Sequence, residues 1–182
     1  MKELSMNILD IAKNSVKARA TLIGIRIEET DGLLTLTITD NGCGMKNEML
    51  RSVIDPFCTT RTTRKVGMGI PLLKLAAEQT GGEVRITSRH EDEYPETHGT
   101  EVVATFYQTH IDFTPMGDII STVTTLIQGS PEIDFTFLHI TDQFCVSLDT
   151  RELRGILGEE IPLGEPEIIR WIAQYLNEQY QN

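Results

Sequence analysis

The chain has 182 residues, of which 40% are hydrophobic and 24% charged, a composition typical of a globular protein rather than a disordered or fibrous one. Its 16 basic and 27 acidic residues give a formal net charge of −11, which argues against nucleic acid as a partner, because such partners require a positive surface. The three cysteines lack CxxC spacing, and the sequence shows neither a signal core nor an apolar run of roughly 20 residues, so we expect a cytoplasmic protein without disulfides, structural zinc or membrane contact.

Residues 1–109 predict one α/β unit. Apolar residues recur at helical spacing from Met6 to Ala20 and predict a first helix. Alternating apolar residues then predict two strands joined by a hairpin turn at Asp31-Gly32. The expected elements after the first helix are strands over 22–27 and 34–38, a helix over 47–54, a buried helix around 72–77 ended by Gly81-Gly82, and strands over 84–88 and 101–107.

The sequence changes character after about residue 110, and we expect residues 110–182 to form a small α/β extension. Helical spacing of apolar residues over 115–127 predicts a helix that ends at Gly129. The other elements expected here are a hairpin around Thr141-Asp142, a short helix capped by Asp149 or Thr150, and an amphipathic helix over 167–180.

Three polar residues of the first helix, Asp10, Asn14 and Lys17, form one ridge, because residues three and four apart are neighbours on a helix. The Asn14 oxygen together with phosphate oxygens suits a magnesium ion, which prefers hard oxygen ligands and retains several waters. Lys17 could meet phosphate charge, and Asp10 could hold a water as a general base. A solvated helix face explains the same ridge, and it is the explanation we favour when the ridge is taken alone.

Two glycine-containing segments predict close backbone approach to a ligand. Asp40-Asn-Gly-Cys-Gly44 follows a strand, where the carboxylate can accept a hydrogen bond from an exocyclic amine and the glycines let the backbone approach a flat ring. Gly67-Met-Gly69 opens a helix whose unpaired N–H groups can bind phosphate. Arg61, Arg64 and Lys65 lie just upstream and form a basic cluster in an acidic chain. Taken alone, the first segment is explained better by an ordinary Asn-Gly turn, and the second is explained equally well by a solvated surface loop.

Combined with Gly99-Thr100, these motifs resemble the GHKL superfamily of ATPases (gyrase, heat-shock chaperone, histidine kinase and MutL) over roughly residues 3–107. Asn14 matches the N box, and the two glycine segments match the glycine boxes. Asp55-Pro-Phe-Cys-Thr-Thr-Arg61, with a short lid, is similar to the nitrogen-sensor type of histidine kinase catalytic domain. The resemblance implies the Bergerat ATP-binding fold, a two-layer α/β sandwich with a mixed, mostly antiparallel sheet and helices on one face, followed by the small extension.

The same resemblance implies ATP and Mg²⁺ as cofactors and gives a role to each matching residue. Asn14 would ligate magnesium, Lys17 would contact phosphate and Asp40 would bind the adenine amine, while Thr100 would reach adenine through water. The remaining residues of the implied nucleotide site are Gly42 and Gly44 at the purine, Phe57, Thr59, Thr60 and Arg61 in the lid, and Gly67 and Gly69 at the phosphates. Met45, Met68 and Leu72 are also expected to contact the nucleotide.

Two departures from the superfamily pattern bear on the reaction. Asp10 stands where the hydrolytic branches carry Glu, and a carboxylate one methylene shorter could pull an attacking water out of line. His90-Glu-Asp-Glu-Tyr-Pro95 resembles a phosphoacceptor motif but lies in a polar connection between strands, so we expect no acceptor in the chain itself. The sequence therefore favours transfer of the γ-phosphoryl group to a histidine or serine of a separate protein. The alternatives are an ATP-dependent interaction or switch module, or a slow ATPase coupled to dimerisation.

Overall fold

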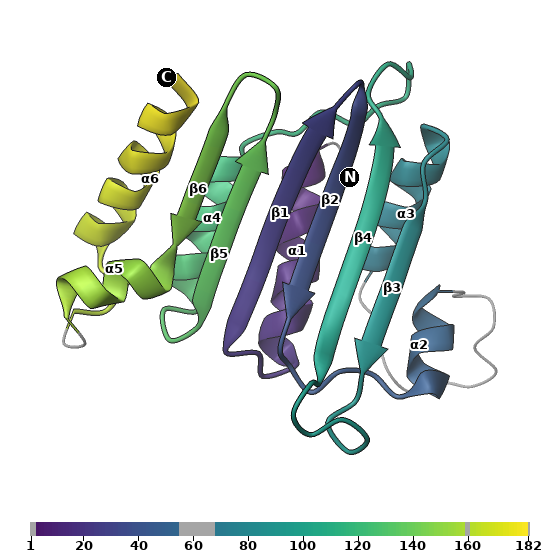
Figure 1. Cartoon of the computed structure of the whole chain (residues 1–182), viewed down its shortest axis with the longest axis horizontal. Helices are drawn as coiled ribbons and strands as arrows, with labels where there is room; N and C mark the ends of the chain where they lie inside the picture. Colours follow the sequence, from purple (N-terminus) through teal and green to yellow (C-terminus); the bar gives the residue numbers. More distant parts are fainter. Residues whose placement is uncertain (1–2, 55–67, 159–160, 182) are drawn as a thin grey trace.

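A six-stranded sheet forms the centre of the computed structural model, which describes residues 3–54, 68–158 and 161–181 (Figure 1). The strand order is β3-β4-β2-β1-β5-β6. β1 and β5 run parallel, and the other neighbouring pairs are antiparallel, which confirms the predicted mixed, mostly antiparallel sheet. The strands are β1 Leu22–Thr30, β2 Leu33–Asp40, β3 Val84–Arg89, β4 Gly99–Tyr107, β5 Asp134–Ile140 and β6 Cys145–Asp149.

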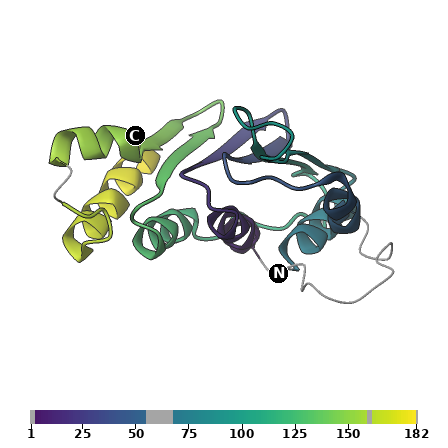
Figure 2. The same ribbon diagram turned by 90° about the horizontal axis from the view of Figure 1, so that it is seen from below.

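Helices lie side by side against one face of the sheet, as Figure 2 shows, and this confirms the predicted two-layer arrangement. They include α1 (Leu4–Lys17), α3 (Gly69–Gln79) and α4 (Ile119–Gly129). α2 (Asn47–Ile54) packs beside β3 at one edge of the sheet. At the opposite edge, α5 (Thr150–Leu157) contacts β5 and α6 (Pro166–Gln181) contacts β6.

The core fills the space between the sheet and these helices. In β1 and β2 every second side chain is buried, because successive side chains of a strand point to opposite faces. α1 buries its apolar stripe against them, and each fully buried large side chain stabilises the fold by about 1.5–3 kcal/mol. The core residues of these three elements are Ile23, Ile25 and Ile27 of β1, Leu34, Leu36 and Ile38 of β2, and Leu4, Ile8, Ile11 and Ala12 of α1.

The hairpin turn between β1 and β2 lies at Asp31 and Gly32, where the sequence predicts it. Both residues have positive φ, 52° and 76°. A two-residue turn with two positive φ values is of the type whose twist matches that of antiparallel strands.

The predicted helix over 115–127 begins later than expected, at Ile119. Asp118 caps it by accepting a hydrogen bond from the Ser121 N–H at 2.8 Å. The carbonyls of Pro115 and Met116 instead accept hydrogen bonds from the N–H groups of Leu4 and Ser5, at 2.9 and 2.8 Å. The apolar spacing over 115–118 therefore does not indicate helix. The backbone of this segment instead pairs with the first N–H groups of α1, which have no partners within their own helix.

The extension continues the main sheet, because β5 pairs with β1. The predicted boundary between residues 109 and 110 therefore falls within one continuous sheet and stays a prediction. The outer edge at β6 is capped by Gln179 of α6, whose side chain accepts from the Ser147 N–H at 2.9 Å and donates to the Ser147 carbonyl at 3.0 Å. An edge strand covered in this way offers fewer free backbone groups to another chain.

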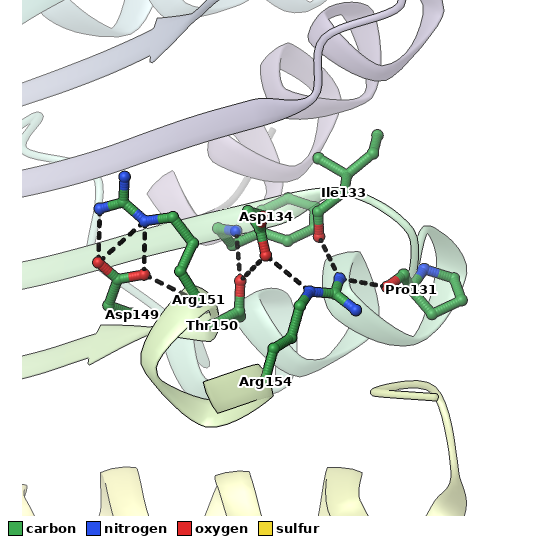
Figure 3. A network of polar contacts seen from close by, with 8 residues as sticks. Pro131, Ile133, Asp134, Asp149, Thr150, Arg151 and Arg154 are labelled. Atoms are coloured by element: carbon green, nitrogen blue, oxygen red, sulfur yellow. Dashed lines mark hydrogen bonds and ion pairs between the residues drawn. The ribbon is translucent and has the colours of Figure 1, made fainter. Parts of the chain in front are cut away.

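A polar network fixes α5 against β5 (Figure 3). Asp149 caps α5, as predicted, by accepting from the Arg151 N–H at 2.9 Å, and the hydrogen bond from the Arg151 guanidinium lowers the pKa of the Asp149 carboxyl. The Thr150 hydroxyl donates to Asp134 at 2.9 Å and accepts from the Phe135 N–H at 2.8 Å. Arg154 donates to the same Asp134 oxygen at 2.8 Å, so the short helix is held by charge-assisted bonds as well as by packing.

His139 of β5 links the first part of the chain to α6. The ring is 4% exposed, and its Nε2 and Nδ1 lie 2.8 Å from Glu29 Oε1 and 2.7 Å from the Tyr180 hydroxyl. Burial and the charge of Glu29 raise the pKa of Tyr180, so the phenol keeps its proton. An imidazole with hydrogen on Nε2 and a lone pair on Nδ1 then satisfies both neighbours.

Replacing Tyr180 with phenylalanine is expected to lower the free energy of unfolding by about 1–2 kcal/mol, because Nδ1 of His139 loses its buried partner. Tyr107→Phe is the matched control, since the Tyr107 ring is half exposed on β4. Urea unfolding followed by circular dichroism measures both variants. Equal unfolding midpoints for the two would show that the Tyr180 hydroxyl contributes nothing.

Within the described parts of the chain, none of the helices has both the length and the apolar character required to cross a membrane.

Candidate functional site

Asp40, the last residue of β2, is held by two hydrogen bonds from different segments. The Ser15 hydroxyl of α1 donates to Asp40 Oδ2 at 2.6 Å, and the Gly42 N–H donates to Oδ1 at 2.9 Å. Ser15 is 4% exposed, whereas Asp40 is only partly buried. A carboxylate offers about four lone-pair sites, so both oxygens keep capacity for a further donor. The carboxylate is thus oriented by the protein and still able to accept from a ligand amine.

The turn after Asp40 is wedged between α1 and the end of β3. The Cys43 N–H donates to the Ala18 carbonyl at 2.8 Å, and the Cys43 carbonyl accepts from the Glu91 N–H at 2.9 Å. Gly44 has φ +68°, and a Cβ there would collide with the Arg89 carbonyl. Glycine is therefore required by both backbone conformation and space.

Thr100 lies directly opposite Asp40 in the pairing of β2 with β4. Its hydroxyl is 2.8 Å from the Ser88 hydroxyl, which also accepts from the Met45 N–H at 2.8 Å. The Nδ1 of His98 is 2.6 Å from the Gly42 carbonyl. Asp40, Gly42, Met45 and Thr100 are thus gathered at one end of the sheet.

The start of α3 meets α1 one turn before Asn14. A Cβ added to Gly69 would lie 3.1 Å from the Cβ of Asp10, so the absence of a side chain lets the two helices approach at this level. The residue before α3, Met68, is exposed and makes no side-chain capping bond. The first N–H groups of a helix lack intrahelical partners and carry partial positive charge, which favours an anion.

α1 therefore contacts both glycine segments, through Asp10 at one and Ser15 at the other. Asn14 is half-buried and lies between these two contacts along the helix, while Asp10 and Lys17 are exposed. Leu72 is half-buried one turn into α3. The polar groups around this region are the oriented carboxylate of Asp40, the amide oxygen of Asn14, the ammonium group of Lys17 and the N-terminus of α3. This combination fits a nucleotide with a magnesium ion on its phosphates.

Several predicted site residues lie outside the described part of the chain. They are Phe57, Thr59, Thr60, Arg61 and Gly67, together with Arg64 and Lys65 of the basic cluster. Their roles stay predictions.

Three residues that touch the site were missed by sequence reasoning: Ser15, Ser88 and His98. Ser15 left a usable signal, because it continues the buried spacing of Ile8 and Ile11 and so places a hydroxyl at a core position. Nothing in the local sequence marks Ser88 or His98, since their partners at Met45 and Gly42 come from a distant segment.

Comparison with known proteins supports the same interpretation. Residues 2–110 match the family described as histidine kinase-, DNA gyrase B-, and HSP90-like ATPase. The signal transduction histidine-protein kinase AtoS of Escherichia coli K12 is 28% identical over 88 residues, 48% of this chain and 14% of AtoS. A putative sensor protein of Shewanella frigidimarina is 30% identical over 91 residues, again 48% of this chain and 14% of the relative. The chain thus spans a small part of the length of these relatives.

Two solved structures show the same fold over most of the chain. The MutL ATPase domain of Aquifex aeolicus complexed with ADP has a TM-score of 0.53 at 15% identity, over 78% of this chain and 61% of that one. The N-terminal domain of a DNA repair protein has a TM-score of 0.54 at 18% identity, over 82% and 52%. The family match covers more than half of the chain and includes the described glycine segments and Asn14. The chain therefore belongs to the histidine kinase-, DNA gyrase B- and HSP90-like ATPase family, and its match to that family supports ATP binding by a histidine kinase-like domain.

Proposed function

We propose that the chain binds Mg-ATP at this site and passes the γ-phosphoryl group to a separate protein. The observation that carries the proposal is the Asp40 carboxylate, oriented by Ser15 and Gly42 and still able to accept a hydrogen bond. The family match and the histidine kinase relatives support it. We place the reaction in the cytoplasm, where ATP and magnesium are available.

Asp40 selects the base in this proposal. The exocyclic amine of adenine donates to the carboxylate, and Ser15 and Gly42 keep that carboxylate from turning away. Guanine presents a carbonyl oxygen at the corresponding position, so two acceptors would face one another. An acceptor left unpaired in a buried site costs about 1–3 kcal/mol, which favours adenine over guanine. Thr100, opposite Asp40, orders a water between the protein and the ring.

The middle of α1 and the start of α3 hold the phosphates. Asn14 provides the oxygen ligand for the magnesium ion, which when bound neutralises phosphate charge. Lys17, the last residue of α1, and the N–H groups that begin at Gly69 add further positive charge. Phosphoryl transfer depends mainly on positioning and charge neutralisation, so this set serves a donor site without a covalent intermediate on the protein.

Incubation with γ-labelled ATP tests the proposal, with the protein alone and with an extract of its source. We expect label on another polypeptide in the extract, and no label when the Asp40→Asn variant replaces the parent chain. The stability of the label to acid and base then separates phosphohistidine from phosphoserine. If the protein binds ATP but no polypeptide in the extract becomes labelled, the result would contradict phosphoryl transfer to a partner.

A slow ATPase or a nucleotide-dependent switch is the second candidate, and Asp10 favours it. Asp10 lies against Gly69 at the phosphate end, but its side chain is one methylene shorter than glutamate. Misplacement of an attacking water by about 1 Å can slow a reaction about a hundredfold. Phosphate release without transfer, abolished in Asp10→Ala, would identify an ATPase, and tight binding with neither product would identify a switch.

The Ser15→Ala variant is expected to weaken ATP binding about fivefold, because one of the two bonds that orient Asp40 is lost, a change of about 1 kcal/mol. Ser121→Ala is the control, since the Ser121 side chain is exposed on α4. Titration calorimetry gives both dissociation constants. If Ser15→Ala binds ATP as the parent does, the hydroxyl has no part in orienting the carboxylate.

A further inference from the structure

The negative charge of the protein is concentrated in its last 73 residues. Residues 110–182 contain 12 acidic residues, three arginines and no lysine, and so contribute −9 of the net −11. Two of the arginines are already in ion pairs, Arg151 with Asp149 at 2.6 Å and Arg154 with Asp134 at 2.8 Å. The extension therefore carries a strongly negative surface, which attracts cationic partners.

The inner face of α6 is fixed to the sheet at several points. Ile172 and Leu176 are fully buried in the core. Near the end of the helix, Gln179 bonds to the backbone of Ser147, and the Tyr180 hydroxyl lies 2.7 Å from Nδ1 of His139. The position and rotation of α6 are thus set by this inner face, and the core does not require aromatic residues on the outer one.

The outer face of α6 nevertheless carries two stacked aromatic rings. Trp171 is 49% exposed and Tyr175 38% exposed. Their rings are parallel to within 9°, with centroids 5.1 Å apart, because the residues are one helical turn apart. Glu167 lies one turn before Trp171, and Glu178 follows Tyr175 by about one turn; both are exposed on the same side of the helix. We call Glu167, Trp171, Tyr175 and Glu178 the α6 ridge.

We propose that the α6 ridge is the docking surface for a basic, arginine-containing segment of a partner protein. Tryptophan and tyrosine are enriched among the residues that dominate interface energies. A guanidinium group stacks on such rings and pairs with carboxylates, which the ridge offers at both ends of the aromatic stack. A second copy of the chain is a poor occupant, because it would bring one negative surface against another. The proposal does not depend on phosphoryl transfer.

The ridge supplies its own probe, because Trp171 is the only tryptophan of the chain. We would titrate the full chain with a 14-residue helical peptide of leucine, alanine and arginine, and with two versions that carry lysine or glutamate in place of arginine. The expected result is that the arginine peptide shields Trp171 from iodide and acrylamide and lowers the quenching constants at least about twofold. The lysine peptide should bind more weakly, and the glutamate peptide should not bind.

Matched variants separate the ridge from general charge attraction, with binding of fluorescein-labelled arginine peptide followed by anisotropy. Trp171→Ala and Glu167→Lys should each weaken binding about tenfold or more. Tyr107→Ala and Asp112→Lys are the controls, since both residues are exposed, Tyr107 on β4 and Asp112 between β4 and α4, and each should change binding less than about twofold. All four substitutions are on the surface, and circular dichroism checks that each variant is folded.

Three results would overturn the proposal. One is equal weakening of peptide binding by Asp112→Lys and Glu167→Lys, which would mean that the peptide responds to the overall negative charge and not to the α6 ridge. Another is a dimer in sedimentation velocity that Trp171→Ala dissociates, which would make a second copy the occupant. The third is unshielded Trp171 fluorescence at saturating arginine peptide.

Discussion

Replacing Asp40 with asparagine is expected to weaken ATP binding about a hundredfold, a loss of about 3 kcal/mol. In asparagine an NH₂ group, which donates hydrogen bonds, replaces one carboxylate oxygen, which accepts them. This NH₂ group would face either Ser15 or the ligand. The adenine amine would then face a donor. The shape of the side chain is unchanged, so the effect isolates the polarity of one group from packing.

The base preference makes this prediction specific to adenine recognition. Inosine triphosphate presents a carbonyl oxygen where ATP presents its amine, so Asp40→Asn should bind it as well as or better than ATP. Asp142→Asn, in the exposed turn between β5 and β6, is the control and should leave both affinities unchanged. Titration calorimetry with each nucleotide and magnesium measures them. If the Asp40→Asn variant still prefers ATP over inosine triphosphate as the parent does, Asp40 does not contact the base.

The second large effect is expected for Gly99→Ala, with a loss of about 3 kcal/mol in the free energy of unfolding. Gly99 has φ +139°, and a Cβ there would collide with the carbonyl oxygen of Asp40. The Cβ meets a backbone atom rather than a flexible side chain, so β4 must move away from β2 at the Asp40–Thr100 pair. ATP binding should fall in the folded fraction as well, because Asp40 moves with its carbonyl.

Thermal unfolding by calorimetry measures this change, and a shift of about 6–12 °C in the midpoint is expected for a chain of this size. Gly155→Ala in α5 is the matched control, because no atom lies within 4 Å of the added Cβ and the residue is helical. The control should raise stability by about 0.5–1 kcal/mol. A Gly99→Ala variant as stable as Gly155→Ala would mean that the close approach of β4 to Asp40 is relaxed in solution.

The sequence was most informative where a local pattern and a backbone requirement coincide. The alternation of β1 and β2, the Asp31-Gly32 turn and the Asp149 cap all depend on neighbouring residues, and the structure confirms each. The glycine motifs were informative for the same reason, since Gly44 has a backbone conformation that other residues rarely adopt.

Features that depend on contacts between distant segments were not predictable. The start of α4 was misplaced because Pro115 and Met116 serve the N–H groups of α1, more than 100 residues earlier. The parallel pairing of β5 with β1, which makes the extension part of the main sheet, left no mark in the spacing of either strand. Ser88 and His98 belong with them, because each acts on the site through a hydrogen bond to a remote turn.

A crystal structure of the full chain with a non-hydrolysable ATP analogue and magnesium tests the central claim most directly. The account predicts the adenine amine about 2.7–3.2 Å from an Asp40 carboxylate oxygen, with Ser15 still bonded to that carboxylate. It also predicts the magnesium ion on the Asn14 oxygen. A nucleotide bound elsewhere, or at this end of the sheet with its base turned away from Asp40, would contradict it.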